Sequence, residues 1–138
     1  MSDYQQSRAL AKSLHTALSG DIGVTNLLGN PARLYDHAPE DPVYPYLTYG
    51  PMRSEDKGGD DAPLTTHSLS LHVWSRYEGR AEILKCLSAV TGVIEGGTIA
   101  MSGGKIIRAN VLYTDNFRAA DGRTLHGLLR LSITTEPT

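Results

Sequence analysis

One stretch of the chain, residues 64–93, changes its hydrophobic period halfway along, and this change limits the possible folds more than any other feature. Over 68–74 apolar and polar residues alternate, which is typical of a strand with one buried face. Over 83–94 apolar residues recur every three or four positions, which predicts a helix with one apolar stripe. Ser75 and Glu78 have the spacing of a capping box where the period changes. We therefore expect a strand that leads directly into a helix on the same sheet, with no room for a catalytic loop between them. The predicted stripe consists of Ile83, Leu84, Leu87, Val90 and Ile94.

Hydrophobic patterns and turn signals divide the rest of the chain into short elements. The predicted elements are a helix over 3–19, one short helical turn at 25–28, a short strand at Leu34–Tyr35, a strand at 46–50, a hairpin over 98–113 that turns at Gly103–Gly104, a turn at Asp121–Gly122, and a last strand over 124–134. Connections of hairpin length favour an antiparallel sheet. The predicted fold class is therefore α+β, a mostly antiparallel sheet with two amphipathic helices packed on one face.

Length and composition limit the class of protein. The 138 residues predict one domain spanning 1–138, large enough for a core of modest size. The formal charge of -2 and the absence of a Lys/Arg block argue against tight binding to nucleic acid, which needs clustered phosphate contacts. Cys86 is the single cysteine, which fits a reducing compartment. Neither a signal peptide nor an apolar run of about 20 residues is seen, so we expect a soluble cytoplasmic protein with no membrane contact.

The most polar segment separates two predicted strands. Residues 51–63 contain a Gly58–Gly59 pair and charges of both signs, and they offer little apolar surface to bury. We therefore expect a mobile arm at about 51–63 between the two strands. The charged residues of this arm are Arg53, Glu55, Asp56, Lys57, Asp60 and Asp61.

The strand positions that point away from the predicted helices carry a mixed set of side chains. They include Trp74, Leu128 and Arg130, and the set is too apolar for a bare solvent face and too polar for a core. This face is a candidate for association with other copies of the chain; alternatively, Trp74 and Leu128 pack under the polar arm. Arg76, just after the strand, joins Trp74 and Arg130 as a candidate contact residue.

No set of residues has a recognisable catalytic or metal-binding spacing. His67 and His72 are five residues apart on one strand, so they point to opposite faces. A metal site or hydrolase built from His37, His67 and His126 requires the fold to collect them, without support from spacing. Cys86 lies in mid-helix, where a half-buried structural thiol is expected and a thiolate is not favoured. The sequence predicts no catalytic, cofactor-binding or metal-binding residue, and hence a protein that is not an enzyme.

Five short motifs follow one another along the chain, from about residue 5 to Pro137. They are an N-terminal amphipathic helix with Leu27-Leu28-Gly29 after it, a Y-D-H-x-P segment at Tyr35–Pro39, a P-Y-hydrophobic strand start at Pro45–Leu47, a strand end V-W-S-R at Val73–Arg76 that enters a helix, and D-G-x-T-x-H-G with alternating hydrophobic residues at Asp121–Leu131. In this order they resemble the tail-completion or tail-terminator proteins of long-tailed phages and related gene transfer agents. The polar arm falls where that family varies.

The resemblance implies a structural role. Members of this family form a hexameric ring on the head-proximal end of the tail tube, stop tube polymerisation and present a surface to the neck proteins. The implied partners are other copies of the chain, the tail tube protein and a neck or head-completion protein, with DNA passing through the lumen without specific binding. A nearly neutral chain suits such a conduit. On the same resemblance the arm at 51–63 is a candidate contact with another subunit or with the tube, and its acidic groups would repel DNA if they face the lumen; a solvated loop without a partner is the other interpretation. The protein would be cytoplasmic during assembly and then part of the tail of the mature particle, in a phage, a prophage or a gene transfer agent.

Two other classes stay open on the sequence alone. One is a small dimeric α+β protein-binding module of unknown partner, which predicts a closed dimer at all concentrations. The other is the small hydrolase or metal enzyme that uses His37, His67 and His126, which predicts a stoichiometric metal and loss of activity on His→Ala substitution.

Overall fold

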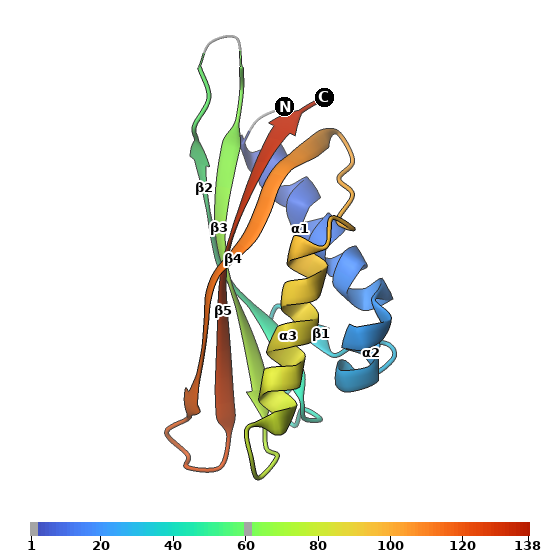
Figure 1. Ribbon diagram of the computed structural model, residues 1–138, viewed down its shortest axis with the longest axis vertical. Coiled ribbons are helices and arrows are strands. Elements are labelled where there is room, and N and C mark those ends of the chain that lie inside the picture. The colour runs from blue at the N-terminus through green and yellow to red at the C-terminus, as the bar shows by residue number, and fades with distance from the viewer. Residues whose placement is uncertain (1–2, 60–61) are drawn as a thin grey trace.

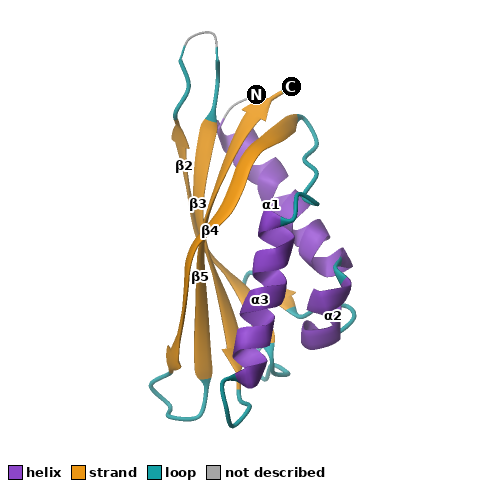
Figure 2. Cartoon of the chain, viewed as in Figure 1, coloured by secondary structure: helices purple, strands orange, loops and turns teal. Residues whose placement is uncertain are grey.

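The computed structural model describes residues 3–59 and 62–138, and this part of the chain contains three helices and five strands. In chain order they are α1 (Asp3–Gly20), α2 (Ile22–Leu28), β1 (Leu34–Tyr35), β2 (Tyr46–Asp56), β3 (Thr65–Ser75), α3 (Ala81–Glu95), β4 (Gly104–Arg118) and β5 (Leu125–Pro137). The strands form one twisted sheet with all three helices on the same side of it (Figure 1). The predicted α+β class is confirmed, with a third helix, α2, on the covered side of the sheet (Figure 2).

The five strands lie in the order β1-β2-β3-β5-β4, so the last strand of the chain is inserted between β3 and β4. Only the two-residue β1 runs parallel to its neighbour, and the other three pairings are antiparallel. Every residue of β3 has a partner on β5, from Thr65 opposite Thr135 to Ser75 opposite Leu125. This continuous ladder explains why the last strand begins within one residue of the predicted start and runs on to Pro137, past the predicted end.

Side chains of the central strands alternate between two very different faces. The face toward the helices, called the covered face below, holds Leu69, Leu71, Val73, Leu129, Leu131 and Ile133, each at most 3% exposed. The face away from the helices, called the open face, holds the residues between them. The alternation predicted over 68–74 is therefore confirmed, because a strand with one buried face places every second side chain in the core.

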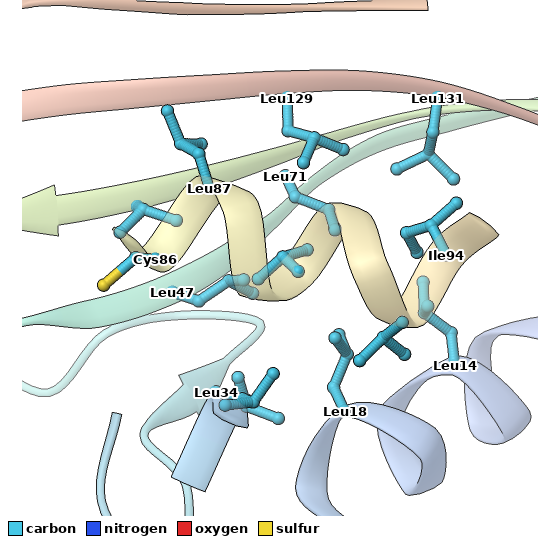
Figure 3. Close-up of a cluster of buried hydrophobic side chains, with 14 of the residues drawn as sticks. Leu14, Leu18, Leu34, Leu47, Leu71, Cys86, Leu87, Ile94, Leu129 and Leu131 are labelled. Carbon is cyan, nitrogen blue, oxygen red and sulfur yellow. The ribbon is translucent and has the colours of Figure 1, made fainter. Parts of the chain in front are cut away.

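Helices α1 and α3 complete the core from the covered side, as Figure 3 shows for Leu14 and Leu18 opposite Ile94. Helix α1 agrees within one residue with the predicted span of 3–19. The predicted stripe of α3 is confirmed at four positions, but Leu84 is 49% exposed. One residue of an α-helix turns the side chain by about 100°, which carries Leu84 from the buried line of Ile83, Leu87, Val90 and Ile94 to the solvent.

The start of α3 differs from the predicted capping box. The helix begins at Ala81, and its N-cap residue, Arg80, makes no side-chain hydrogen bond to the first turn. Ser75 is still the last residue of β3; its hydroxyl accepts from the Tyr77 backbone N–H at 3.2 Å and donates to Glu82 Oε1 at 2.7 Å. Ser75 still pairs with Leu125, so β3 ends there and five residues connect it to α3. The glutamate that binds the Ser75 side chain is therefore Glu82 and not the predicted Glu78.

Strand β2 is longer than its sequence suggested. The expectation that a strand ends at Pro51 and a structureless arm follows is wrong for 51–56, which continue β2 and pair with β3 up to Asp56 opposite Thr65. A register shift between Tyr49 and Met52 places Pro51 in an irregular part of the strand, where a residue without an N–H is tolerated. The irregular connection is therefore shorter, and Asp60 and Asp61 within it lie outside the described residues.

The predicted hairpin over 98–113 is also wrong. Residues 98–101 form no strand, and β4 is one 15-residue strand from Gly104 to Arg118 that pairs with β5. Ile99 and Met101 pack against the core as irregular chain, so their apolar character serves burial and not strand pairing. The predicted turn at Asp121–Gly122 is confirmed between β4 and β5, with Gly122 at φ 72°.

A glycine on β5 sets the distance between the sheet and α3. A Cβ on Gly127 would lie 3.0 Å from Ile83 Cγ1 and 3.3 Å from Leu87 Cδ2. Gly127 points to the covered face beneath the first turns of α3, where a larger residue would push the helix away from the strand. The packing of α3 on β5 therefore depends on the missing side chain at this position.

Candidate functional site

The described candidate contact residues lie in three places along β3: one group at each end, and Arg130 opposite Ser70 in the middle. Arg53, Glu55, Asp56 and Lys57 lie at the far end of β2, whereas Trp74 pairs with Tyr46 at its start. Leu128 lies opposite His72 of β3, whereas Asp56, the last residue of β2, lies opposite Thr65. These two positions on β3 are about 23 Å apart at ~3.3 Å per residue. The alternative in which Trp74 and Leu128 pack under the polar arm is therefore wrong, because the arm follows the other end of β2. The role of these residues as contacts stays a prediction.

Glu55 forms ion pairs with two neighbouring basic side chains at the surface. Glu55 Oε1 lies 3.2 Å from Arg53 Nε, and its Oε2 lies 3.4 Å from Lys57 Nζ. The Asp56 carboxylate accepts from the Gly58 backbone N–H at 3.0 Å, which turns the chain at the end of β2. These ion pairs are exposed and of the kind that contributes about 0–1 kcal/mol, so Glu55 can exchange partners at little cost.

Ring side chains gather on the open face at the start of β2 and the end of β3. We call them the ring cluster; its members are Tyr44, Tyr46, His72, Trp74, Phe117 and His126. Trp74 is central: it stacks on His126 at a centroid distance of 4.0 Å and lies 6.3 Å from Tyr46. Its indole N–H donates to Thr48 Oγ1 at 3.0 Å, so the one polar atom of the ring is satisfied. Phe117, on β4, remains 44% exposed.

Two histidines of the ring cluster share a hydrogen bond. His72 Nδ1 lies 2.7 Å from His126 Nε2 across the β3–β5 pair. Burial lowers the pKa of His72, and burial together with the charge of His72 lowers the pKa of His126. Both rings are therefore neutral near pH 7, and one ring donates its N–H to the unprotonated nitrogen of the other. Gly50 allows the close approach of β2, because a Cβ there would lie 2.8 Å from His72 Nε2.

Arg76, a candidate contact, is held by partners within the chain. Its guanidinium lies 4.4 Å from the Tyr44 ring centroid, and its Nε donates to Thr124 Oγ1 at 3.2 Å. Asp121 accepts from the Thr124 hydroxyl at 2.7 Å and from the backbone N–H groups of Arg123 and Thr124 at 2.9 Å. These hydrogen bonds lower the pKa of Asp121 to about 2. Arg76 thus connects the ring cluster to the β4–β5 turn.

The middle of the open face is hydroxylic. Arg130 Nη1 donates to Ser70 Oγ at 2.6 Å, and the hydroxyls of Thr66 and Thr134 lie 3.1 Å apart. Ser70 is only 6% exposed although it points away from the core, because neighbouring side chains cover it. The two central strands of the open face therefore carry hydroxyls and one arginine at their middle, unlike the aliphatic covered face, and most of the other charges of the open face lie on β2 and β4.

His67 belongs to the covered face and is fully buried. Its Nδ1 lies 2.8 Å from Ser54 Oγ, its Nε2 lies 2.9 Å from Thr135 Oγ1, and Ser54 Oγ lies 2.6 Å from Ser7 Oγ on α1. A serine beside a histidine has the spacing of a nucleophile and a base. Here, however, the third group is a hydroxyl and not a carboxylate, and the exposed fraction of His67 is 0%. This network connects α1 to three strands and serves packing.

The candidate metal ligands are separated by the sheet. His67 lies on the covered face, His126 on the open face, and His37 is exposed in the connection after β1. The prediction that His67 and His72 point to opposite faces is confirmed. Within 3–59 and 62–138, no three His, Cys, Asp or Glu side chains converge as metal ligands. Cys86 is buried at 1% exposure, deeper than the half-buried position expected, and burial raises the pKa of its thiol to about 12.

A groove of about 760 Å³ lies between α1 and the outer part of the covered face. Apolar side chains, among them Leu14, Met52 and Leu71, line it, and Arg8 and Lys12 on α1 stand at its rim. His15 and Tyr49 also line the groove, and His15 Nδ1 lies within hydrogen-bond distance of the Tyr49 hydroxyl, at 2.8 Å. Burial raises the pKa of Tyr49 above its ordinary value. The groove follows β2 beyond β1, where the sheet edge has no further described strand.

Sequence reasoning missed the histidine pair and the full ring cluster. Period-two alternation places His72, Trp74 and His126 on the outward face, but only the pairing of β3 with β5 brings His126 against the other two. No local signal identifies that pairing, because β5 follows β4 in the chain and could have paired with it alone.

Ring side chains, hydroxyls and unpaired strand edges are the features of a surface that binds other proteins. Of the solved structures, a chain of the virion of a native gene transfer agent particle matches with a TM-score of 0.85 and 21% identity, over 96% of this chain and 98% of that one. The structure of the bacteriophage SPP1 gp17 protein matches with a TM-score of 0.66 and 21% identity, over 94% and 91% of the two chains. No curated protein matches the sequence.

The sequence itself matches the family model of the tail completion protein gp17 over residues 12–136. The match includes α2, α3, the second half of α1 and all five strands except the last residue of β5. The chain therefore belongs to the tail completion protein gp17 family, and the family resemblance stated from the sequence is confirmed. No helix within the described residues is long and apolar enough to span a membrane.

Proposed function

We propose that this protein is a tail-terminator subunit: copies of it form a hexameric ring on the head-proximal end of a tail tube, stop the polymerisation of the tube and join it to the neck. The family match over residues 12–136 is the observation that supports this proposal most strongly. The partners are other copies of the chain, the tail tube protein and a neck or head-completion protein. The protein acts by steric capping, without catalysis, after assembly in the cytoplasm.

Features of the chain favour a ring with an open lumen. A ring needs contacts between two different surfaces of each copy, and the sheet offers two different edges, one at β4 and one at β1 and the part of β2 beyond it. DNA must pass without binding, and a formal charge of -2 without a basic block suits this requirement.

Deletion of the gene tests the proposal directly. We expect electron microscopy of particles from producing cells to show filled heads without tails, together with loose or over-long tubes. Complementation with the wild-type gene is the control and should restore tailed particles. Normal tailed particles in the deletion strain would refute the terminator role and favour the small dimeric protein-binding module.

A further inference from the structure

We propose that β4 of one copy pairs antiparallel with β2 of the next copy, with Arg108 opposite Glu55, so that the sheets of neighbouring subunits become continuous. The partner is a second copy of this chain. This inference rests on the proposed ring and specifies which edges and which residues close it.

Both edges of the sheet are open to a further strand. On one side β1 pairs only with Leu47 and Thr48, so the outer edge of β2 from Tyr49 to Asp56 has no strand partner within the described residues. On the other side, the described chain places no strand beyond the 15 residues of β4. A long unpaired edge presents backbone N–H and C=O groups to any strand that fits, so each of these two edges can accept a strand from another chain.

The two edges fit each other in direction. Three antiparallel pairings separate β2 from β4, so these two strands run in opposite directions. When two copies stand side by side in the same orientation, β4 of one is therefore antiparallel to β2 of the other. Contacts of this kind use two different surfaces and repeat around an axis, which is the requirement for a closed ring.

The rows of paired residues across the sheet fix the register. One row runs from Glu55 through Thr66 and Thr134 to Arg108, and another from Met52 through Leu69 and Leu131 to Val111. Copies related by a ring axis along the strands stand at the same height. Each row then continues into the next subunit, with Arg108 beside Glu55 and Val111 beside Met52.

The side chains that meet in this register are complementary. Arg108 and Glu55 both point to the open face, and within residues 3–59 and 62–138 no salt bridge holds Arg108. The exposed ion pairs of Glu55 with Arg53 and Lys57 can rearrange to admit it. Leu112, the extra residue beside Val111 at a break in the β4 register, is 55% exposed and comes next to Met52, which lines the apolar groove.

A charge reversal and its compensation test the pairing. We expect Arg108→Glu and Glu55→Arg each to lower the number of tailed particles at least about tenfold in the complemented deletion strain, because each places like charges side by side at a contact that is repeated around the ring. The double variant E55R/R108E should recover to within about threefold of wild type. Lys85→Glu, an exposed reversal on α3, is the matched control and should have no effect.

Thermal unfolding of each variant by circular dichroism separates folding from assembly. All four variants should unfold at the same temperature as wild type, since exposed substitutions have little effect on stability. Full tail yield with either single reversal would refute the pairing. Failure of the double variant to recover would refute it as well.

Disulfide cross-linking tests the register independently of charge. Arg53 and Asn110 occupy one row on the open face, through Ser68 and Ser132, so R53C with N110C should give a ladder of cross-linked subunits from oxidised particles. R53C with D115C, on the same face of β4, should give none. Wild-type particles, in which the native cysteine Cys86 is buried, are the background control and should give no ladder. If wild-type particles have tails but R53C/N110C gives no ladder, the edge pairing is wrong while the terminator role stands.

Discussion

The two faces of this sheet are made by the same strands, yet different forces hold their side chains. Leu129 and Leu128 are consecutive in β5; Leu129 is 0% exposed beneath the helices, whereas Leu128 is half-buried on the open face. The covered face is aliphatic and close-packed, with His67 as its buried ring. The open face is held by stacked rings, a histidine pair and hydroxyl hydrogen bonds.

The difference teaches which face stabilises the subunit and which is available to partners. Aliphatic burial contributes to folding in proportion to the area removed from water and carries little directional information. Rings and hydroxyls at a surface leave polar atoms accessible and recognise a partner by geometry. We therefore expect substitutions on the covered face to act through folding, and those on the open face and edges to act through assembly.

Truncation of the two neighbouring leucines gives the largest contrast. Leu129→Ala should lower the free energy of unfolding by about 2–5 kcal/mol, because it leaves a cavity among fully buried neighbours. Leu128→Ala, the same chemical change one residue earlier, should cost about 1 kcal/mol or less. Urea unfolding followed by circular dichroism measures both. Equal losses at the two positions would show that the open face is part of the folding core.

Filling the space beneath α3 gives an intermediate effect on the covered face. Gly127→Ala places a Cβ 3.0 Å from Ile83 Cγ1, and such overpacking costs about 1–3 kcal/mol. Gly79→Ala is the control, since a Cβ there meets nothing within 4 Å. Thermal unfolding of the two variants compares them. An unchanged midpoint for Gly127→Ala would mean that α3 shifts away from β5 without cost.

Acid should act on the open face, with the smallest effect of the three. The folded-state pKa values of His72 and His126 are lowered, so below about pH 6.5 the unfolded chain binds protons that the folded chain does not. Stability is therefore full above pH 6.5 and decreases as the pH falls. Urea unfolding at several pH values between 7.5 and 5 measures this decrease.

His126→Phe keeps a ring on Trp74 but cannot be protonated, so it should reduce the loss of stability in acid. His37→Gln, at an exposed histidine outside the ring cluster, should leave the loss unchanged. A wild-type protein whose stability is constant over this pH range would contradict the lowered pKa values.

The sequence by itself determined the local features of this protein. Period-two alternation identified the buried residues of β3 and β5, and period-3.6 patterns identified α1 and the buried line of α3, because side-chain direction follows from backbone geometry within a few residues. Ordered motifs also identified the family. Where local signals conflicted, as at Pro51 and Gly103–Gly104, the predicted boundaries were wrong because strand pairing extended β2 and β4.

Only the tertiary structure decided which strands became neighbours. The insertion of β5 between β3 and β4 joins residues more than fifty positions apart, such as His72 with His126 and Ser70 with Arg130, and no local pattern encodes that choice. The same pairing leaves β4 at one edge and, beyond the two-residue β1, the end of β2 at the other, and it aligns Glu55 with Arg108 along one row. Pairing is selected by the burial of a shared covered face, a property of the whole sheet and not of any one segment.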